Sequence, residues 1–251
     1  MCIIRLENIT FGYDDGEPVL ENFNLSVARG RCLLVRGSNG AGKTTLFRIL
    51  NGLEFPECGS YLYDGTVIDA EYLKENSRSN RFHKRIGYLF QNPDVMLFCG
   101  SVYEEIAFGP RQMGLDDKQV DERVCDCMRL MGIESIRDKA PYHLSGGQKK
   151  LTALAAVLAL NPETVILDEP FAGLDRNSTE RLAEILAELK SAGKTLLIAA
   201  HDDIMTDNLI DDIIHVGRGV GDEPGISNIK LAADNTRACS GQADDCCDNT
   251  R

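Results

Sequence analysis

The sequence lacks a long apolar run. Its longest uninterrupted apolar stretch, Ala153 to Leu160, has eight residues, whereas a membrane-spanning helix needs roughly 18 or more. The first ten residues, MCIIRLENIT, hold neither the basic segment nor the apolar core of a secretory signal. These absences predict a soluble, intracellular protein.

Basic residues are also scarce, with 27 Lys and Arg against 39 Asp and Glu and a formal net charge of −12. Proteins that bind nucleic acid neutralise phosphates with a basic face. The charge balance therefore argues against that class, although a local basic patch would still permit it. The length of 251 residues and a hydrophobic content of 43% predict one globular unit, or one with a small subdomain, that can bury a core.

No Cys-x-x-Cys pair occurs among the nine cysteines, and their number is odd. We therefore expect free thiols in a reducing compartment rather than a disulfide framework. Cys32 lies within an apolar run, which is typical of a core residue. Cys239, Cys246 and Cys247 lie close to aspartates near the C-terminus, and metal or redox chemistry there remains the minor alternative.

Hydrophobic spacing predicts the order of the elements. Strands are expected at 3–9, 23–27, 32–35, 86–90, 165–167, 195–200 and 213–216. Helical segments are expected at 43–50, 101–160 and 178–190, a small hairpin at 56–68 and an exposed polar loop at 76–85. The alternation of strands and helices in the second half predicts a parallel sheet covered by helices. Residues 219–251 are rich in polar and small residues, and we expect a mobile tail that contains Cys and Asp.

A phosphate-binding loop is predicted from Gly37 to Thr44, where the sequence GSNGAGKT matches GxxxxGK[ST]. It follows an apolar strand and precedes a helical segment, which is the context that the motif requires. Glycine lets backbone N–H groups approach a polyphosphate closely, and the helix N-terminus adds partial positive charge. Lys43 is expected to reach the β- and γ-phosphates and Thr44 to ligate Mg²⁺. This loop alone does not distinguish between classes of nucleoside triphosphatase.

An acidic pair, Asp168 and Glu169, follows the apolar segment 165–167. Side chains at the carboxyl end of a parallel strand face the ligand crevice, so Asp168 is expected to hold Mg²⁺ and Glu169 to act as the general base on the attacking water. Gln91 and His201 also follow strand-like segments. Each of these two could contact the water or the phosphate, but each alone is more often structural.

The segment Leu144-Ser145-Gly146-Gly147-Gln148 resembles the signature of ATP-binding-cassette (ABC) ATPases, and Ser145 lies 23 residues before Asp168. Tyr13, the phosphate loop, Gln91, this signature, the acidic pair, the segment Ala172-Gly-Leu-Asp175 and His201 follow in the order of that family. The resemblance covers about residues 1–218. It implies an α/β fold: a P-loop NTPase with a RecA-like parallel sheet core, an N-terminal antiparallel β-subdomain and an inserted α-helical signature subdomain at about residues 92–160.

In this family two chains enclose two ATP molecules head to tail, so the resemblance implies dimerisation and ATP hydrolysis. Tyr13 is expected to stack on adenine, with Phe11 as the competing candidate, and Asp175 to lie at the dimer interface. The implied catalytic residues are Glu169, His201, Gln91 and Lys43, and the implied Mg²⁺ ligands are Thr44, Gln91 and Asp168. The implied ATP-binding residues are Tyr13, Gly37, Ser38, Asn39, Gly40, Ala41, Gly42, Lys43, Thr44 and Thr45. The residues expected to bind the partner chain's ATP are Ser145, Gly146, Gly147 and Gln148.

Within the family, the segment GYLFQNPD from Gly87 and the segment VYEEIAFGP from Val102 resemble ATPases of energy-coupling-factor and cobalt-type importers. That resemblance implies uptake of a vitamin or a transition-metal ion, a peripheral position at the cytoplasmic face of the membrane, and two membrane partners: a coupling protein and a substrate-binding protein. Met96 and Phe171 depart from the usual pattern. Whether the second cassette is the same chain or a sister chain stays open.

The alternative is a soluble ABC ATPase that acts on nucleic acid or ribosomes. Repair ATPases of that kind carry a very long insertion between the positions of Gln91 and Ser145, which here lie only 54 residues apart. Translation-type relatives usually carry two cassettes in one chain, and this sequence has one. The acidic balance points in the same direction, so we expect no nucleic-acid partner.

Overall fold

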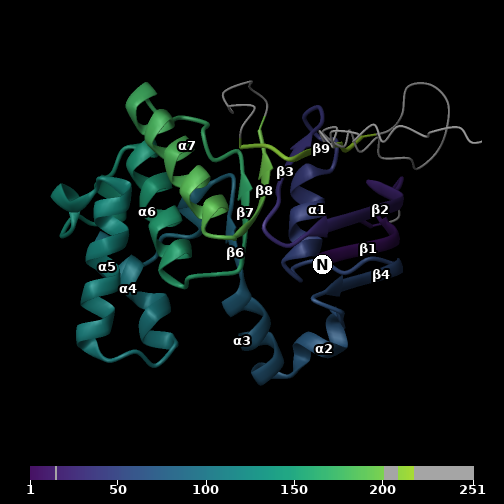
Figure 1. Cartoon of the computed structure of the whole chain (residues 1–251), viewed down its shortest axis with the longest axis horizontal. Coiled ribbons are helices and arrows are strands. Elements are labelled where there is room, and N and C mark those ends of the chain that lie inside the picture. The colour runs from purple at the N-terminus through teal and green to yellow at the C-terminus, as the bar shows by residue number, and fades with distance from the viewer. Residues whose placement is uncertain (15, 201–208, 218–251) are drawn as a thin grey trace, which may run out of the picture.

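The computed structural model describes residues 1–14, 16–200 and 209–217. An antiparallel sheet lies on one side of the molecule, a parallel sheet runs through the middle, and helices α4 to α7 lie on the other side (Figure 1). The expected position of His201 and the expected tail at 219–251 fall outside the described residues.

The antiparallel sheet has the strand order β2-β1-β4-β5. Its strands are β1 (Cys2–Phe11), β2 (Leu20–Ala28), β4 (Cys58–Tyr63) and β5 (Thr66–Val67). The predicted hairpin is confirmed, because β4 and β5 pair antiparallel with Tyr63 opposite Thr66. Asp64 and Gly65 form its two-residue loop with φ of 50° and 77°, the left-handed pair that a tight hairpin turn requires.

The parallel sheet has the order β6-β7-β8-β3-β9, and all neighbours run parallel. Its strands are β3 (Cys32–Arg36), β6 (Ile86–Leu89), β7 (Thr164–Asp168), β8 (Thr195–Ala199) and β9 (Asp212–His215). Every residue of β7 and β8 is buried, as expected for a sheet covered on both faces.

Successive residues of these strands belong to two separate cores. Leu196 and Ile198 pack with helices α4 (Val102–Gln112), α5 (Asp117–Met131), α6 (Gly146–Ala159) and α7 (Arg176–Ser191). Leu197, between them, packs with α1 (Lys43–Leu50) and the antiparallel sheet. The period of two along a strand therefore divides the hydrophobic core between the two faces of the sheet.

The expected loop at 76–85 is wrong, because these residues form helix α3 (Asn76–Arg85), which follows the short helix α2 (Ala70–Lys74). Phe82 is 3% exposed, and its ring meets those of Tyr61 and Tyr63 edge-on at 6.4 and 5.7 Å. A single apolar anchor therefore holds an otherwise polar helix against the antiparallel sheet. Tertiary packing, rather than a hydrophobic stripe, stabilises this segment.

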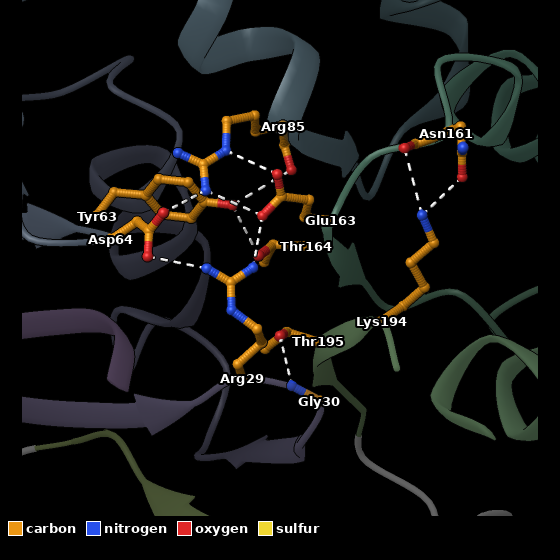
Figure 2. Close-up of polar contacts among 10 residues, drawn as sticks. All are labelled: Arg29, Gly30, Tyr63, Asp64, Arg85, Asn161, Glu163, Thr164, Lys194 and Thr195. Atoms are coloured by element: carbon orange, nitrogen blue, oxygen red, sulfur yellow. Dashed lines mark hydrogen bonds and ion pairs between the residues drawn. The ribbon is translucent and has the colours of Figure 1, made fainter. Parts of the chain in front are cut away.

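A network of four charged side chains joins the two sheets (Figure 2). Arg85, at the end of α3, donates hydrogen bonds to Glu163 at 2.9 Å and to Asp64 at 2.6 Å. Arg29, after β2, binds the same two carboxylates at 2.6 and 2.8 Å. Arg85 and Glu163 immediately precede β6 and β7, so the network lies at the amino end of the parallel strands.

Six cysteines lie in the described part of the chain, and all six are free thiols, as predicted. Cys32 is fully buried, and burial raises the pKa of its thiol to about 12. The cluster of Cys239, Cys246 and Cys247 lies outside the described residues. Among the residues that the structure describes, no helix combines the length and the hydropathy that crossing a membrane requires.

Candidate functional site

The predicted phosphate-binding loop connects the end of β3 to the start of α1 (Figure 1). Gly42 caps the helix with φ 101°, a left-handed conformation that favours glycine. At Gly37 an added Cβ would lie 2.3 Å from the Val216 carbonyl oxygen, so no side chain fits there. The Lys43 ammonium group donates to the carbonyl oxygens of Gly37 at 2.7 Å and Ser38 at 3.2 Å, and the loop thus curves around this cation.

A pocket of about 370 Å³ opens over this loop. Besides the loop itself, it is lined by Tyr13, Val19, Gln91, Asp168 and Glu169. The lining loop residues are Ser38, Asn39, Gly40, Ala41, Gly42, Lys43, Thr44 and Thr45. The structure thus brings together residues that are distant in sequence at the carboxyl ends of β3, β6 and β7. No motif pointed to Val19, whose side chain packs beside Gly42.

Thr44 and Asp168 meet in this pocket, where the threonine hydroxyl donates to the carboxylate at 2.7 Å. Asp168 is 1% exposed. Burial raises the pKa of its carboxyl group, while the hydrogen bond from Thr44 and the charge of Lys43 oppose that rise. A hydroxyl and a carboxylate are the hard oxygen donors that Mg²⁺ prefers, together with phosphate oxygens. In the described ranges no group of three or more His, Cys, Asp or Glu side chains could hold a metal.

Glu169 directly follows β7 and adopts φ 52°, a left-handed conformation that costs energy for a residue with a side chain. Its N–H donates to the Ala199 carbonyl oxygen at 2.9 Å. Its own carbonyl oxygen accepts a hydrogen bond from the buried Lys150 at 2.7 Å. Sequence reasoning missed Lys150, because it lies in the polar first turns of the signature helix (GGQKK), where a lysine is usually exposed.

The structure separates the two aromatic candidates for stacking on a base. Tyr13 is 41% exposed and lines the pocket, and its hydroxyl lies 3.4 Å from that of Thr45. Phe11 is 6% exposed within β1 and meets the Tyr13 ring edge-on at 4.9 Å. Phe11 therefore supports Tyr13 from the sheet, and only Tyr13 presents a ring to the pocket.

The signature residues form the start of α6. The Ser145 hydroxyl accepts a hydrogen bond from the Gln148 N–H at 3.3 Å, and the Gln148 side chain accepts one from the Ser145 N–H at 3.1 Å. This capping box fixes the first turn. Gly146 is exposed, and a Cβ added to it would meet nothing within 4 Å. None of these residues lines the pocket at the phosphate loop.

Asp175 is likewise outside that pocket. Its carboxylate caps α7 by accepting from the Ser178 N–H at 2.8 Å, and this backbone hydrogen bond holds the pKa of Asp175 below its ordinary value. Of the two departures from the family pattern, Phe171 is 7% exposed within the helical core. Met96 accepts a hydrogen bond at its sulfur from the Phe90 N–H at 3.4 Å.

The phosphate loop after β3, the acidic pair after β7 and the inserted helices α4 to α6 define a P-loop nucleoside triphosphatase. The model of a family described as "ABC transporter" matches residues 20–172. The chain belongs to this family, and its members' activity, ATP hydrolysis coupled to transport, is that of this chain.

Curated relatives place the chain near the predicted group. The nickel import ATP-binding protein LarO of Lactiplantibacillus plantarum is 44% identical over 200 residues, which cover 80% of this chain and 83% of LarO. The energy-coupling factor transporter ATP-binding protein EcfA of Methanothermobacter thermautotrophicus is 42% identical over 200 residues, 80% of this chain and 63% of EcfA.

A solved structure gives the same result. It is the structure of cbiO1 from Clostridium perfringens, part of the ABC transporter complex cbiONQ, which is 35% identical in sequence to this chain. The two structures align with a TM-score of 0.74 over 86% of this chain and 85% of cbiO1. The predicted fold class and the predicted resemblance to the energy-coupling-factor ATPases are therefore confirmed.

Proposed function

We propose that this chain is the ATP-binding and ATP-hydrolysing subunit of an energy-coupling-factor or cobalt-type importer at the cytoplasmic face of the cell membrane. The observation that carries the proposal is the pocket in which the phosphate loop, the Thr44–Asp168 pair, Gln91 and Glu169 converge. The names of LarO and EcfA support the transport role.

In the proposed mechanism, the backbone N–H groups of residues 37–45 and the N-terminus of α1 hold the phosphates of ATP. Lys43 neutralises the β- and γ-phosphates, and Tyr13 stacks on adenine. Thr44, Asp168 and Gln91 would hold Mg²⁺, which when bound spreads the negative charge of the reacting phosphates.

Glu169 is the proposed general base. Its carboxylate takes a proton from water as the water oxygen forms a bond to the γ-phosphorus and the bond to the β-phosphate oxygen breaks. The left-handed turn at Glu169 leads the chain out of β7 beside the phosphate loop, which places this residue at the pocket. His201 is proposed to stabilise charge on the γ-phosphate, although its position lies outside the described residues.

The pocket of one chain is proposed to be half of a working site. Ser145 and Gly146 are exposed and Gly147 is half-buried at a helix start that a capping box fixes, which suits an anion. Because they do not line the chain's own pocket, the phosphate that they bind is proposed to be that of a second cassette, paired head to tail. Gln148 fixes the turn, and Asp175 lies near the interface. ATP binding closes this dimer, and hydrolysis opens it.

The membrane partner is proposed to dock on the segment after Gln91. A groove of about 310 Å³ with a mainly apolar lining lies between this segment, α4 and α6. Phe98 and Phe108 border it, 68% and 45% exposed, with their rings edge-on at 5.1 Å. Exposed apolar patches of this kind mark protein contacts, and a membrane coupling protein, working with a substrate-binding membrane protein, is the proposed partner.

The transported substrate is proposed to be a vitamin or a transition-metal ion, and the nickel import role in the name of LarO supports the second class. Purifying the tagged chain from detergent-solubilised membranes tests the whole assignment. We expect an integral membrane coupling protein and a substrate-binding membrane protein to copurify in an ATP-hydrolysing complex. Recovery with ribosomes or nucleic acid, and without membrane proteins, would contradict it.

A further inference from the structure

Lys150 is a buried cation on the signature helix that points at the turn carrying the acidic pair. It is 5% exposed, and its ammonium group donates to the carbonyl oxygens of Glu169 at 2.7 Å and Ala172 at 2.8 Å. Burial lowers the pKa of Lys150, while the charges of Glu169 and Asp168 oppose that change. A buried ammonium group is costly unless its donors are satisfied, so these two carbonyls determine where it lies.

The turn from Glu169 to Ala172 is otherwise weakly closed. The Ala172 N–H donates to the Glu169 carbonyl oxygen at 3.3 Å, which is long for a turn. Glu169 itself holds a left-handed backbone conformation, with φ 52°. A non-glycine residue keeps such a conformation only where its surroundings fix it, and Lys150 bonds to both ends of this turn.

The same helix presents the signature to solvent. Ser145 caps α6, and Lys150 follows five residues later, which is roughly 7.5 Å along the axis at about 1.5 Å per residue. A second contact lies between them: a Cβ added to Gly147 would lie 3.4 Å from the Gly173 carbonyl oxygen. The first two turns of α6 are therefore linked to residues 169–173 by the hydrogen bonds of Lys150, and Gly147 lies close enough to Gly173 for ordinary van der Waals contact with an added Cβ.

We propose that Lys150 is a positioning residue that fixes the turn of the general base Glu169 to the helix that binds the partner chain's ATP. The proposal rests on the proposed roles of Glu169 and of the signature. When α6 moves toward the partner's phosphate, Lys150 moves with it. The hydrogen bond from its ammonium group then shifts the backbone of Glu169 in the same chain. One ATP site of the dimer thereby influences the base at the other.

The test compares Lys150→Met with Lys150→Arg in the full-length chain, assembled as its active dimer. Methionine fills a similar volume without the donors, whereas arginine keeps them. We expect Lys150→Met to lower kcat by roughly 10- to 100-fold, the range for a catalytic group displaced by about 1 Å. Its KM and its affinity for a fluorescent ATP analogue should stay within about threefold of the wild type, and Lys150→Arg should recover most of kcat.

Lys149→Met is the matched control, because it removes the same charge from the next residue of the same helix. Lys149 pairs with Asp94 at 2.7 Å and does not reach the turn. We expect its kcat to equal that of the wild type. An unchanged kcat in Lys150→Met, or equal losses in both variants, would overturn the proposal. So would a joint loss of kcat, ATP affinity and melting temperature that Lys150→Arg does not reverse, because that pattern is purely structural.

Should Lys150→Met fail to fold, Lys150→Gln serves instead, since its amide can still donate to one carbonyl. An intermediate kcat between those of the wild type and an inactive Glu169→Gln chain supports the proposal, and a kcat equal to that of the wild type overturns it. The Glu169→Gln variant also distinguishes the proposed role of Glu169 from that of Lys150. If that variant hydrolyses ATP normally, the proposed general base is wrong; if it is inactive while Lys150→Met is normal, only the role of Lys150 is wrong.

Discussion

Thr44 and Asp168 lie 124 residues apart in the chain, and yet the threonine hydroxyl donates to the aspartate carboxylate at 2.7 Å. Thr44 is the second residue of α1, which follows β3, and Asp168 is the last residue of β7. Strand β8 lies between β7 and β3 in the sheet. The hydrogen bond orients both oxygens toward the pocket at the phosphate loop. In the proposed mechanism, a Mg²⁺ ion that arrives with ATP would meet donors that are already arranged.

Glu169→Gln should bind ATP and nearly stop hydrolysis. Glutamine keeps the shape of the side chain but does not accept a proton, so we expect kcat to fall by about 10²- to 10⁴-fold. The closed dimer should accumulate with ATP bound. Steady-state ATPase assays and size-exclusion chromatography with ATP check both effects, and retained turnover would remove Glu169 from its proposed role.

Ser145→Arg should prevent dimer closure and leave ATP binding to each chain intact. The larger side chain occupies the exposed start of α6, outside the pocket of its own chain. Light scattering should show monomers with ATP present, while a fluorescent analogue binds as in the wild type. Dimerisation driven by ATP in this variant would contradict the proposal that the signature binds the partner's phosphate.

Asp168→Asn should weaken binding of Mg²⁺-ATP without lowering stability. The amide is a poorer Mg²⁺ ligand than the carboxylate, and we expect a loss of at least the roughly 10- to 100-fold that is typical of disturbed metal sites. Isothermal calorimetry with and without Mg²⁺ measures this. The affinity for ATP in EDTA should change little, and equal losses in both buffers would argue against a metal role.

Asp168→Asn also tests how the stability of the fold depends on pH. Burial raises the pKa of Asp168 above its ordinary 3.8, so the folded state binds this proton more tightly than the unfolded chain does. The stability that this group contributes therefore falls as pH rises from 3.8 through the folded pKa. At neutral pH the Asp168→Asn variant should melt no lower than the wild type, and a lower melting temperature would contradict the sign.

Glu163→Gln should destabilise the junction between the two sheets. Arg85 is the largest cause of the lowered pKa of Glu163, and Arg29 adds to it. The side chain is 41% exposed, so solvent screening limits the expected loss to about 1 kcal/mol in the free energy of unfolding. Urea denaturation measures it, with Glu184→Gln on α7 as a control that should stay near the wild type.

The lowered pKa of Glu163 determines the pH range over which this side chain stabilises the fold. Because the folded pKa of Glu163 is lowered from 4.5, its stabilisation is present above 4.5 and is lost as pH falls through the folded pKa. The difference between wild type and Glu163→Gln should therefore shrink in acid. A difference that stays constant below this window would assign the loss to packing instead.

Most of the residues that line the pocket were predictable, because they belong to short local motifs. The phosphate loop and the acidic pair are short patterns that follow apolar strands, and parallel topology brings the ends of such strands to one edge. The choice between Phe11 and Tyr13 was not predictable, since both are aromatic and only two residues apart. Burial of Phe11 in β1 and exposure of Tyr13 at the pocket favour Tyr13.

What the sequence missed depends on contacts between distant segments. Helix α3 has one buried apolar side chain, Phe82, and no hydrophobic stripe announces it. From the sequence alone, Lys150 would be predicted to be a surface residue of a polar helix start. Its two acceptors are backbone carbonyl groups, which no sequence pattern reveals. Both are cases in which tertiary structure overrides local preference.

Alternate side chains of β7 and β8 pack into two different hydrophobic cores. This arrangement limits where insertions and deletions can occur in the chain. Inserting or deleting one residue within either strand would turn each following side chain to the opposite core and rotate the residues at the strand's end away from the nucleotide. Viable length variants should therefore occur between the elements, for example in the exposed turn around Gly114. The number of residues within each of these strands is therefore fixed by the nucleotide site at the strand ends.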